Sequence, residues 1–431
     1  MNVHLKALGC RLNEAELERW ALGFQVRGHE ITNHSNRADL VVINTCAVTQ
    51  EAVRKSRQII RRIQRINPQA KLVISGCYAS LPNSHQVDVD GIDLVIPNHD
   101  KDDLVNIIAQ EFDLESKPAA IVSQPGMEAL FARGRHRAFI KIQDGCRYRC
   151  TFCIVTVARG TERSRAIAEI VSEVNKLAEH GIKEAVLTGV HVGGYGSDTG
   201  SSLYELLGAI LADTDLPRLR LASIEPWDLP ENFFELFLNP RLMPHVHLPL
   251  QSGSDSVLRR MGRRCKTAAF EQLINQAREQ VADINVTTDI IVGFPGESEQ
   301  EWREGLAFIE KLKFAHVHIF RYSPRQGTKA AHLPNQIPNQ LTKQRSSELH
   351  QLASRMKRAV LEHHVGQVLP VLWERAIGPC EAGWVQYHGY TPNYLKVSTQ
   401  VPFGENLENE IRTTLLTSIS DGGVSLLAET C

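Results

Sequence analysis

The first quarter of the sequence alternates short apolar runs with longer helix-like stretches, and this alternation limits the fold more than any other feature. The apolar runs stand at 3–8, 40–43, 72–74 and 94–96, and the helix-like stretches at 13–27, 50–66 and 101–112. Strands that alternate with helices are joined by crossover connections and therefore form a parallel sheet. The sequence predicts an N-terminal α/β domain over residues 1–115.

Three of these predicted strands end in the same way, with a cysteine two or three residues after the apolar run. The three residues are Cys10, Cys46 and Cys77. Functional groups in an open α/β sheet gather beyond the carboxyl ends of the strands, so parallel strands would bring the thiols to one edge. A single buried cysteine is usually inert. Three at equivalent places favour a metal cluster, because thiolates are soft metal ligands.

A second α/β alternation lies between about 135 and 325. Its apolar runs stand at 139–142, 185–187, 220–222, 245–248, 285–292 and 315–320, with helix-like stretches at 164–180, 202–212, 230–238, 267–281 and 298–312. Six such units fit a partial or full (β/α) barrel, whose chemistry lies at the C-terminal ends of the strands. Together with a charged, helix-like stretch at 339–365, they form the predicted central domain, 132–365.

The last part of the chain, 366–431, has a different pattern. Short strand-like runs at 368–373, 395–397, 411–418 and 425–427 are separated by Gly and Pro turns, which is typical of a small all-β domain such as a barrel. Such a domain either binds nucleic acid or serves as a dimerisation or capping module. Its aromatic residues could stack on bases or form its core, and these are Trp384, Tyr387, Tyr390 and Tyr394.

A loop with three closely spaced thiols follows the first strand of the central domain. Cys146, Cys150 and Cys153 have a C-x₃-C-x₂-C spacing. Three thiolates can hold three irons of a [4Fe-4S] cluster and leave the fourth iron open to a ligand. Zinc is the alternative, but structural zinc needs four ligands. Neither flank of the loop offers an obvious fourth one, since His136 lies ten residues upstream.

With six cysteines placed, the chain resembles the radical S-adenosylmethionine (SAM) methylthiotransferases over nearly its whole length. The motifs that carry the resemblance are 43–49 (INTCAVT), 141–146 (KIQDGC), 158–160 (ARG), 163–165 (RSR), 247–253 (HLPLQSG) and 288–297 (TDIIVGFPGE). The last domain is similar to the RNA-binding TRAM barrel through 389–394 (GYTPNY). The first motif, followed by 54–58 (RKSRQ), most resembles the branch acting on N6-threonylcarbamoyladenosine in tRNA. The isopentenyladenosine and ribosomal-protein branches are the alternatives.

The resemblance implies two [4Fe-4S] clusters and SAM as cofactors. Cys146, Cys150 and Cys153 would hold the cluster that binds SAM, and the other triad would hold a second cluster that carries the sulfur. Cleavage of SAM would give a radical that removes hydrogen from C2 of the adenine, and a second SAM would supply the methyl group. A reducing electron donor is implied, whereas the sequence identifies no sulfur donor.

Seven further residues are expected around SAM. Phe152 precedes the third cysteine of the loop, where the family has an aromatic side chain beside the adenine. The others stand at or just beyond the ends of predicted strands, and they are Thr188, Gly189, Ser223, Glu225, Gln251 and Gly293. For each of them the alternative is an ordinary strand-end polar group or a turn glycine. The histidine pairs His245/His247 and His316/His318 are expected to pack inside the barrel, because residues two apart share one face of a strand.

Two basic segments border the predicted site. The first comprises Arg54, Lys55, Arg57 and Arg61, and the second comprises Arg159, Arg163 and Arg165. A single basic run is usually a solvated helix face, but two runs beside one site favour a rim that binds phosphate. The expected partner is the anticodon loop of tRNA, since proteins can stack and flip out its splayed bases.

Bulk composition sets the remaining limits. A formal net charge of −1 over 431 residues excludes polyanion binding by overall charge. The start of the chain lacks the apolar core of a signal peptide, and no apolar run reaches membrane-spanning length. Nine cysteines in such a chain indicate reduced thiols or metal ligands. We expect a monomer in the cytoplasm that binds no membrane. The alternative of another class is an iron–sulfur RNA-binding protein without catalysis.

Overall fold

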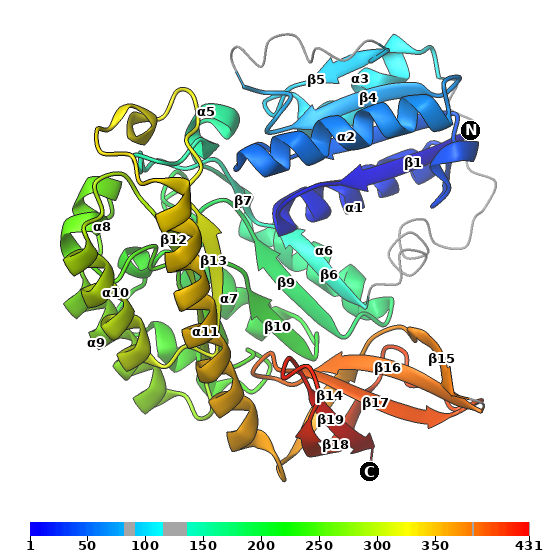
Figure 1. The fold of residues 1–431 in the computed structure, drawn as a ribbon. Helices are drawn as coiled ribbons and strands as arrows, with labels where there is room; N and C mark the ends of the chain where they lie inside the picture. The colour runs from blue at the N-terminus through cyan, green and yellow to red at the C-terminus, as the bar shows by residue number, and fades with distance from the viewer. Residues whose placement is uncertain (82–90, 115–135, 382, 431) are drawn as a thin grey trace.

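The computed structural model describes residues 1–81, 91–114, 136–381 and 383–430. The expected domain boundaries at 115 and 132 lie outside these ranges. Figure 1 shows an N-terminal α/β sheet above a central α/β unit and a C-terminal β-barrel below it. The long helix α11 (Asn339–His364) runs from the central unit to the C-terminal barrel.

The N-terminal sheet is fully parallel, as the alternation predicts. Its strand order is β2-β1-β3-β4-β5. The strands are β1 (Asn2–Ala7), β2 (Glu30–Ile31), β3 (Leu40–Thr45), β4 (Lys71–Gly76) and β5 (Leu94–Ile96). The helices are α1 (Arg11–Val26), α2 (Gln50–Ile66) and α3 (Leu104–Glu111). Every residue of the central strand β3 is buried, which is why it reads as one continuous apolar run.

The central unit contains two three-stranded parallel sheets. The first has the order β10-β9-β6 and the second β11-β12-β13. The strands are β6 (Arg137–Lys141), β9 (Glu184–Thr188), β10 (Arg218–Leu221), β11 (His245–His247), β12 (Asn285–Val292) and β13 (His316–Arg321). Parallel bridges from Leu219 to Leu242 and from Ser223 to His247 join the two sheets. The six strands therefore form the curved wall of a partial barrel.

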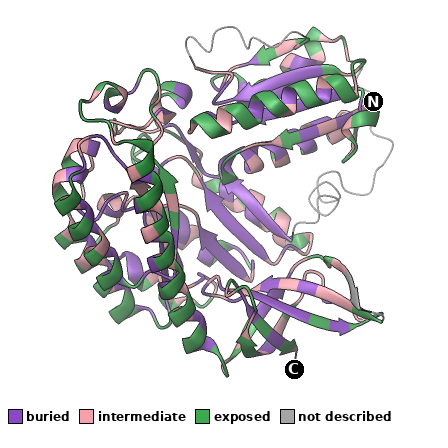
Figure 2. Ribbon diagram, in the orientation of Figure 1, coloured by how far each residue is buried: buried purple, intermediate pink, exposed green. Residues whose placement is uncertain are grey.

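Helices cover the outside of this wall (Figure 2). Five of its strands are almost entirely buried, whereas β13 is largely accessible, with Val317 as its one buried residue. The helices are α6 (Ile167–Glu179), α7 (Leu203–Asp213), α8 (Asp255–Met261), α9 (Thr267–Gln280) and α10 (Glu299–Leu312). The predicted helix at 230–238 is instead a 3-10 helix, Phe233–Leu238. The cysteine loop is flanked by the short pair β7 (Gln143–Asp144) and β8 (Arg163–Ser164), and by the one-turn helix α5 (Val155–Arg159).

The C-terminal domain is a closed barrel. Its strands are β14 (Val368–Trp373), β15 (Gly378–Glu381), β16 (Trp384–Tyr390), β17 (Lys396–Pro402), β18 (Ile411–Ile419) and β19 (Leu426–Thr430). The sheet has the order β14-β18-β19-β17-β16-β15, and pairing of β14 with β16 closes it. This all-β architecture confirms the predicted fold class.

Aromatic residues of this barrel have two different environments. Tyr387 is buried in the barrel core, and Trp384 is 42% exposed. The rings of Tyr390 and Tyr394 stack with centroids 4.9 Å apart and lie against Arg137 and Arg220 of the central unit. Tyr390 and Tyr394 therefore contact protein, whereas Trp384 is open to solvent, as is Phe403 directly after β17.

Arginines at the start of the central strands connect the two units. Arg218 donates to the carbonyl of Pro370 at 2.8 Å, and Arg220 donates to the carbonyl of Pro392 at 2.9 Å. Both lie beside the buried carboxylate of Glu184.

None of the helices in the described ranges combines the length and apolar character needed to cross a bilayer.

Candidate active site at the two cysteine triads

The N-terminal triad forms as predicted at the carboxyl edge of the parallel sheet. Cys10, Cys46 and Cys77 directly follow or lie just beyond β1, β3 and β4. Gly9 has a φ of +96°, and a Cβ atom there would lie 2.6 Å from the Sγ of Cys46. The first strand end therefore lies directly against the second cysteine. Burial, and then the nearby Cys77 and Cys10, raise the pKa of Cys46 to about 11.

Asn13, which the sequence did not single out, ties two of these strand ends together. Its Nδ2 donates to the carbonyl of Leu8 at 2.6 Å and to the carbonyl of Thr45 at 3.1 Å. These carbonyls precede Cys10 and Cys46 by two residues and one residue. Asn13 is 1% exposed, so this buried amide fixes the spacing of two thiols.

The second triad lies on the loop after β6 and β7. The Cys153 amide donates to the Cys150 carbonyl at 3.1 Å, which folds the loop back on itself. The amides of Tyr148 and Val155 point at Cys146 Sγ and Cys153 Sγ, both at 3.4 Å. Burial, and then the nearby Cys150 and Cys146, raise the pKa of Cys153 to about 12.

Both triads have surroundings that suit an iron–sulfur cluster. Thiolate-bound clusters are negatively charged, and hydrogen bonds to their sulfurs adjust them. A buried guanidinium is beside each triad: Arg159 Nε lies 3.3 Å from Cys77 Sγ, and Arg263 contacts Cys150. The cysteine thiols, the backbone amides that point at Cys146 and Cys153, and these two arginines fit a [4Fe-4S] cluster at each triad. That the six cysteines are the ligands of these two clusters stays a prediction.

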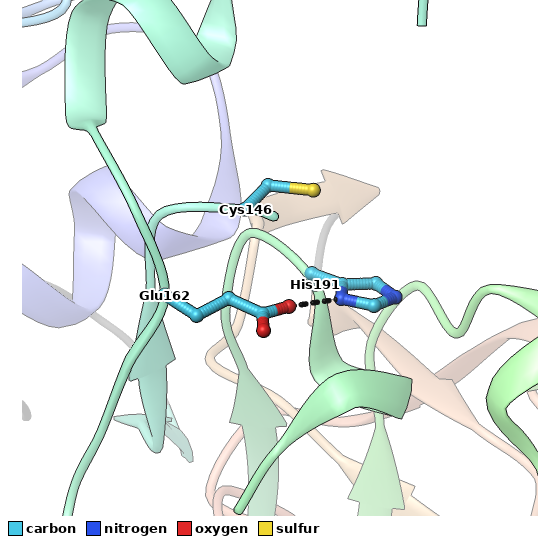
Figure 3. Close-up of side chains that lie close together, drawn as sticks. All are labelled: Cys146, Glu162 and His191. Atoms are coloured by element: carbon cyan, nitrogen blue, oxygen red, sulfur yellow. Dashed lines mark hydrogen bonds and ion pairs between the residues drawn. The ribbon is translucent and has the colours of Figure 1, made fainter. Parts of the chain in front are cut away.

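A mixed metal site at Cys146 would be the alternative to a cluster. Ligand atoms of Cys146, Glu162 and His191 lie within 4.8 Å of one another (Figure 3). However, His191 Nδ1 lies 2.6 Å from Glu162, and its Nε2 lies 2.7 Å from Asp228. Burial opposes protonation, but the hydrogen bonds that His191 donates to Asp228 and Glu162 raise the pKa of His191. An imidazole must be neutral to bind a metal. Because both ring nitrogens of His191 are paired with carboxylates, a cluster held by cysteine thiolates alone is favoured over a mixed site.

A buried charge network joins the N-terminal domain to the cysteine loop. Arg159 donates to Glu16 at 2.9 Å, to Asp144 at 3.0 Å and to Asn13 at 2.6 Å. Lys101 is fully buried and contacts Glu16 and Asp144. Arg159 is 4% exposed, so the expectation that it contacts RNA phosphate is corrected. Its partners are carboxylates, and its place is inside the interface.

The other residues of the predicted RNA rim differ in accessibility. Arg54, Lys55, Arg57 and Arg61 are exposed on one face of α2, opposite its buried side (Figure 2). The Arg163 side chain is 46% exposed. Arg165 is held by Glu173 at 2.7 Å and by the carbonyl of Lys141. The α2 face and Arg163 are therefore available to a polyanion, whereas Arg165 is engaged within the protein.

The predicted SAM-pocket residues differ from one another in their contacts. Phe152 packs edge-on to Phe294 with ring centroids 6.5 Å apart. Glu225 is bound to Arg263 by two contacts of 3.0 and 2.7 Å, so its carboxylate is already paired. Gln251 has a φ of +75°, and its amide donates to the Asp289 carbonyl. Their roles toward SAM stay predictions.

Two cavities adjoin the N-terminal triad. One, of about 1030 Å³, lies between α2 and the end of β13, and its lining includes Cys46, Arg54, Lys55 and Gly293. The other, of about 790 Å³, lies inside the partial barrel, and its lining includes Cys10, Thr188, Gly189 and Ser223. Gly9 and Phe320 line both cavities. The cysteines at the sheet edge are thus accessible from two sides.

Comparisons with known proteins agree with this architecture. Residues 140–309 match the radical SAM superfamily, and residues 2–97 match the uncharacterized protein family UPF0004. A radical SAM methyltransferase, TsrM from Kitasatospora setae, shares the fold with a TM-score of 0.57 and 18% identity, covering 77% of each chain. The fold and the site define a radical SAM protein with an added N-terminal α/β domain and a C-terminal β-barrel.

Sequence relatives specify the family. A threonylcarbamoyladenosine tRNA methylthiotransferase MtaB from Bacillus subtilis is 35% identical, covering 92% of this chain and 89% of the relative. The protein of the same name from Thermotoga maritima is 34% identical over 98% of this chain and 96% of its own length. A tRNA-2-methylthio-N(6)-dimethylallyladenosine synthase from Staphylococcus haemolyticus is 32% identical over 86% and 74%. The chain belongs to the radical SAM tRNA methylthiotransferases, and its cofactors are SAM and two [4Fe-4S] clusters.

Proposed function

We propose that the chain adds a methylthio group to C2 of N6-threonylcarbamoyladenosine in the anticodon loop of tRNA. The observation that carries this proposal is the contact of Arg159 with Cys77, because it joins the two thiol triads across one buried interface. Sulfur insertion needs two sites of different function beside one substrate. The MtaB relatives, at 34–35% identity over nearly the whole chain, support this particular adenosine.

When bound, SAM and the clusters supply the radical that removes hydrogen from C2 and the sulfur that replaces it. The protein side chains hold the geometry. Asn13 fixes the strand ends of Cys10 and Cys46, and Arg159 offsets negative charge at Cys77. Phe152 and Phe294 form an apolar wall near the cysteine loop that excludes water.

Exposed basic residues support an RNA substrate. The face of α2 with Arg54, Arg57 and Arg61 borders the larger cavity and a smaller hollow beside Arg325. A row of exposed guanidinium groups attracts the phosphate backbone, which would bring the anticodon loop to the opening beside Cys46. We further infer that the protein acts as a monomer in the cytoplasm and receives electrons from a reducing partner.

The runner-up keeps the chemistry and changes the base to N6-isopentenyladenosine. It is supported by the 32% identity to the dimethylallyladenosine enzyme of Staphylococcus haemolyticus. A rival of another class is an iron–sulfur protein that binds RNA without catalysis. These readings differ in the tRNA nucleosides that each would leave in the cell.

Mass spectrometry of total tRNA nucleosides from a deletion strain tests the proposal. We expect the 2-methylthio derivative of N6-threonylcarbamoyladenosine to disappear and its precursor to accumulate. The wild-type gene should restore the product, and a gene encoding Cys153→Ala should not. Loss of the isopentenyl derivative alone would favour the runner-up. An unchanged nucleoside profile would favour the non-catalytic protein.

A further inference from the structure

The cavity inside the partial barrel contains a polar cluster that the proposed chemistry does not use. We call this cavity, of about 790 Å³, the histidine cavity, and its lining includes Cys10, His247, Asp289, His318, Lys357 and Lys396. Its volume lies within the range of small-ligand sites. Because Cys10 lines the same space as the polar cluster, a base positioned beside the N-terminal triad would have part of its structure in this cavity.

His247, Asp289 and His318 form the polar cluster. They come from the neighbouring strands β11, β12 and β13, and the register pairs Asp289 with His318. Their ligand atoms lie within 4.8 Å of one another. His247 is held from both sides, because Nδ1 lies 2.9 Å from Thr287 Oγ1 and Nε2 lies 3.2 Å from Asp289.

His318 is the free member of this cluster. Its ring contacts His247 and His316, with centroids 5.4 and 4.5 Å away. Among the described residues it makes no hydrogen bond, although it is exposed to the cavity. An imidazole with two unused nitrogens, beside a fixed His–Asp pair, can both donate to and accept from a polar ligand.

Two lysines line the same cavity. Lys357 comes from α11 and Lys396 begins β17 of the C-terminal barrel. Neither forms an ion pair with any carboxylate in the described part of the chain, and both are only partly exposed. Both side chains line the same cavity, and burial, and then the positive charge of Lys396, lower the pKa of Lys357. Two partly buried lysines that pair with no carboxylate in the described ranges make a place for an anion.

We propose that the histidine cavity is the binding site for the N6 substituent of the target adenosine. The threonylcarbamoyl group ends in a carboxylate and carries a hydroxyl and a urea. Lys357 and Lys396 bind the carboxylate, while His318 and Asp289 form hydrogen bonds with the hydroxyl and the urea. This assignment rests on the proposed function and adds to it the residues that select the base. An isopentenyl group would leave these polar groups unpaired, and such a site rejects the apolar analogue strongly.

A phosphate of the RNA backbone is the other anion that the lysines could bind. The two sources separate when the tRNA body is held constant and only the target base changes. Binding of the cluster-loaded protein is therefore measured with a tRNA that carries threonylcarbamoyladenosine and with the same tRNA carrying plain adenosine. The variants are Lys357→Met with Lys396→Met, and His318→Leu. Lys343→Met is the matched control, since Lys343 is exposed on the same helix and lines neither cavity.

We expect the wild-type protein to bind the modified tRNA more tightly than the plain one. The double lysine variant should lose about 10- to 100-fold in affinity for the modified tRNA, the value of charge-assisted hydrogen bonds, and keep its affinity for plain tRNA. His318→Leu should lose less, and His318→Asn should recover part of that loss. Lys343→Met should behave as wild type.

Three results would overturn the inference. An equal loss on both tRNAs would assign the lysines to backbone phosphate. A preference for modified tRNA that survives in the double lysine variant would place the substituent elsewhere. If the wild-type protein contains a non-iron divalent metal that His318→Leu loses, the polar cluster of His247, Asp289 and His318 is a metal site. The proposed function is tested separately, by methylthiolation of threonylcarbamoyladenosine. If the wild-type protein carries out this reaction while the variants still prefer modified over plain tRNA, only the inference fails.

Discussion

The Nε of Arg159 donates a hydrogen bond to the Sγ of Cys77 at 3.3 Å, although the two residues stand 82 positions apart. The same guanidinium contacts Glu16 of α1 and Asp144 of the cysteine loop. Arg159 therefore belongs at once to the wall of the N-terminal triad and to the loop of the second triad. Movement of one triad relative to the other would break this arginine's contacts.

Replacing Arg159 should damage both stability and cluster binding. Arg159→Met removes the guanidinium between the buried carboxylates of Glu16 and Asp144 and leaves Lys101 and Lys141 beside them. This loss should cost about 3 kcal/mol of unfolding free energy. Bound iron should fall from about eight toward about four per chain, because one cluster site is distorted. Urea unfolding and iron analysis measure these effects. The control is Arg163→Met, whose side chain is 46% exposed; an equal effect of both variants would contradict a specific role for Arg159.

Close packing at Gly253 gives a stability prediction that is independent of the cofactors. A Cβ atom on Gly253 would lie 2.5 Å from the carbonyl oxygen and 2.8 Å from the Cα of Gly305 in α10. Backbone atoms cannot move aside easily, so Gly253→Ala should lower the unfolding free energy by about 2 kcal/mol. Gly208→Ala, in α7, should raise it by about 0.5–1 kcal/mol, because nothing lies within 4 Å of the new methyl group. Equal signs in urea unfolding would refute the packing argument.

Glu301 should make stability depend on pH in the acidic range. Its hydrogen bonds from Arg260, at 2.9 and 2.8 Å, lower the pKa of Glu301 to about 2 from 4.5. A lowered pKa in the folded state gives stability that is complete above about 4.5 and is lost as the pH falls toward 2. We expect about 2 kcal/mol for a group close to the surface.

The variant Glu301→Gln should remove this part of the acid sensitivity. Thermal unfolding of the metal-free protein between pH 6 and about 3 measures it. Glu304→Gln, an exposed position in the same helix, is the matched control. If Glu301→Gln and wild type lose stability in parallel over this range, the ion pair with Arg260 does not contribute as described.

The basic face of α2 should contribute to RNA affinity through charge alone. Replacing Arg54, Arg57 or Arg61 with alanine should weaken tRNA binding and reduce the slope of log affinity against log salt by about 1 each. Both effects should be the same for modified and plain tRNA. Arg303→Ala on α10 removes an exposed arginine outside both cavities and should change neither value. A slope that is unchanged by the α2 variants would exclude this face from the RNA contact.

The fold was largely predictable, because short stretches of the sequence determine its strands and helices. Each apolar run became a strand, and the parallel arrangement that follows from alternation was enough to bring Cys10, Cys46 and Cys77 together. One departure is 230–238, where Phe233–Leu238 forms a 3-10 helix. Its aromatic residues pack against one another, as the ring contacts of Phe233, Phe234 and Phe237 show, and this tertiary packing outweighs the local helical pattern.

The site's supporting residues were not predictable, because they meet only across the interface. Arg159 stands in a basic run, which by itself favours exposure, yet its partners Asn13 and Glu16 are more than 140 positions away. Lys101 is fully buried for the same reason. The histidines were expected to pack inside the barrel. All four line the cavity inside the barrel, but His245 is buried whereas His318 is exposed to the cavity, a difference that period-2 alternation along a strand does not reveal.

The central claim is that the two triads perform different parts of one reaction on threonylcarbamoyladenosine in tRNA. Liquid chromatography with mass spectrometry of one anaerobic reaction, containing reconstituted protein, reductant, SAM and the modified tRNA, tests it most directly. The wild-type protein should form both 5′-deoxyadenosine and the methylthio nucleoside. Cys10→Ala should form 5′-deoxyadenosine alone, and Cys153→Ala should form neither. Methylthio nucleoside from Cys10→Ala, or none from the wild-type protein, would contradict the account.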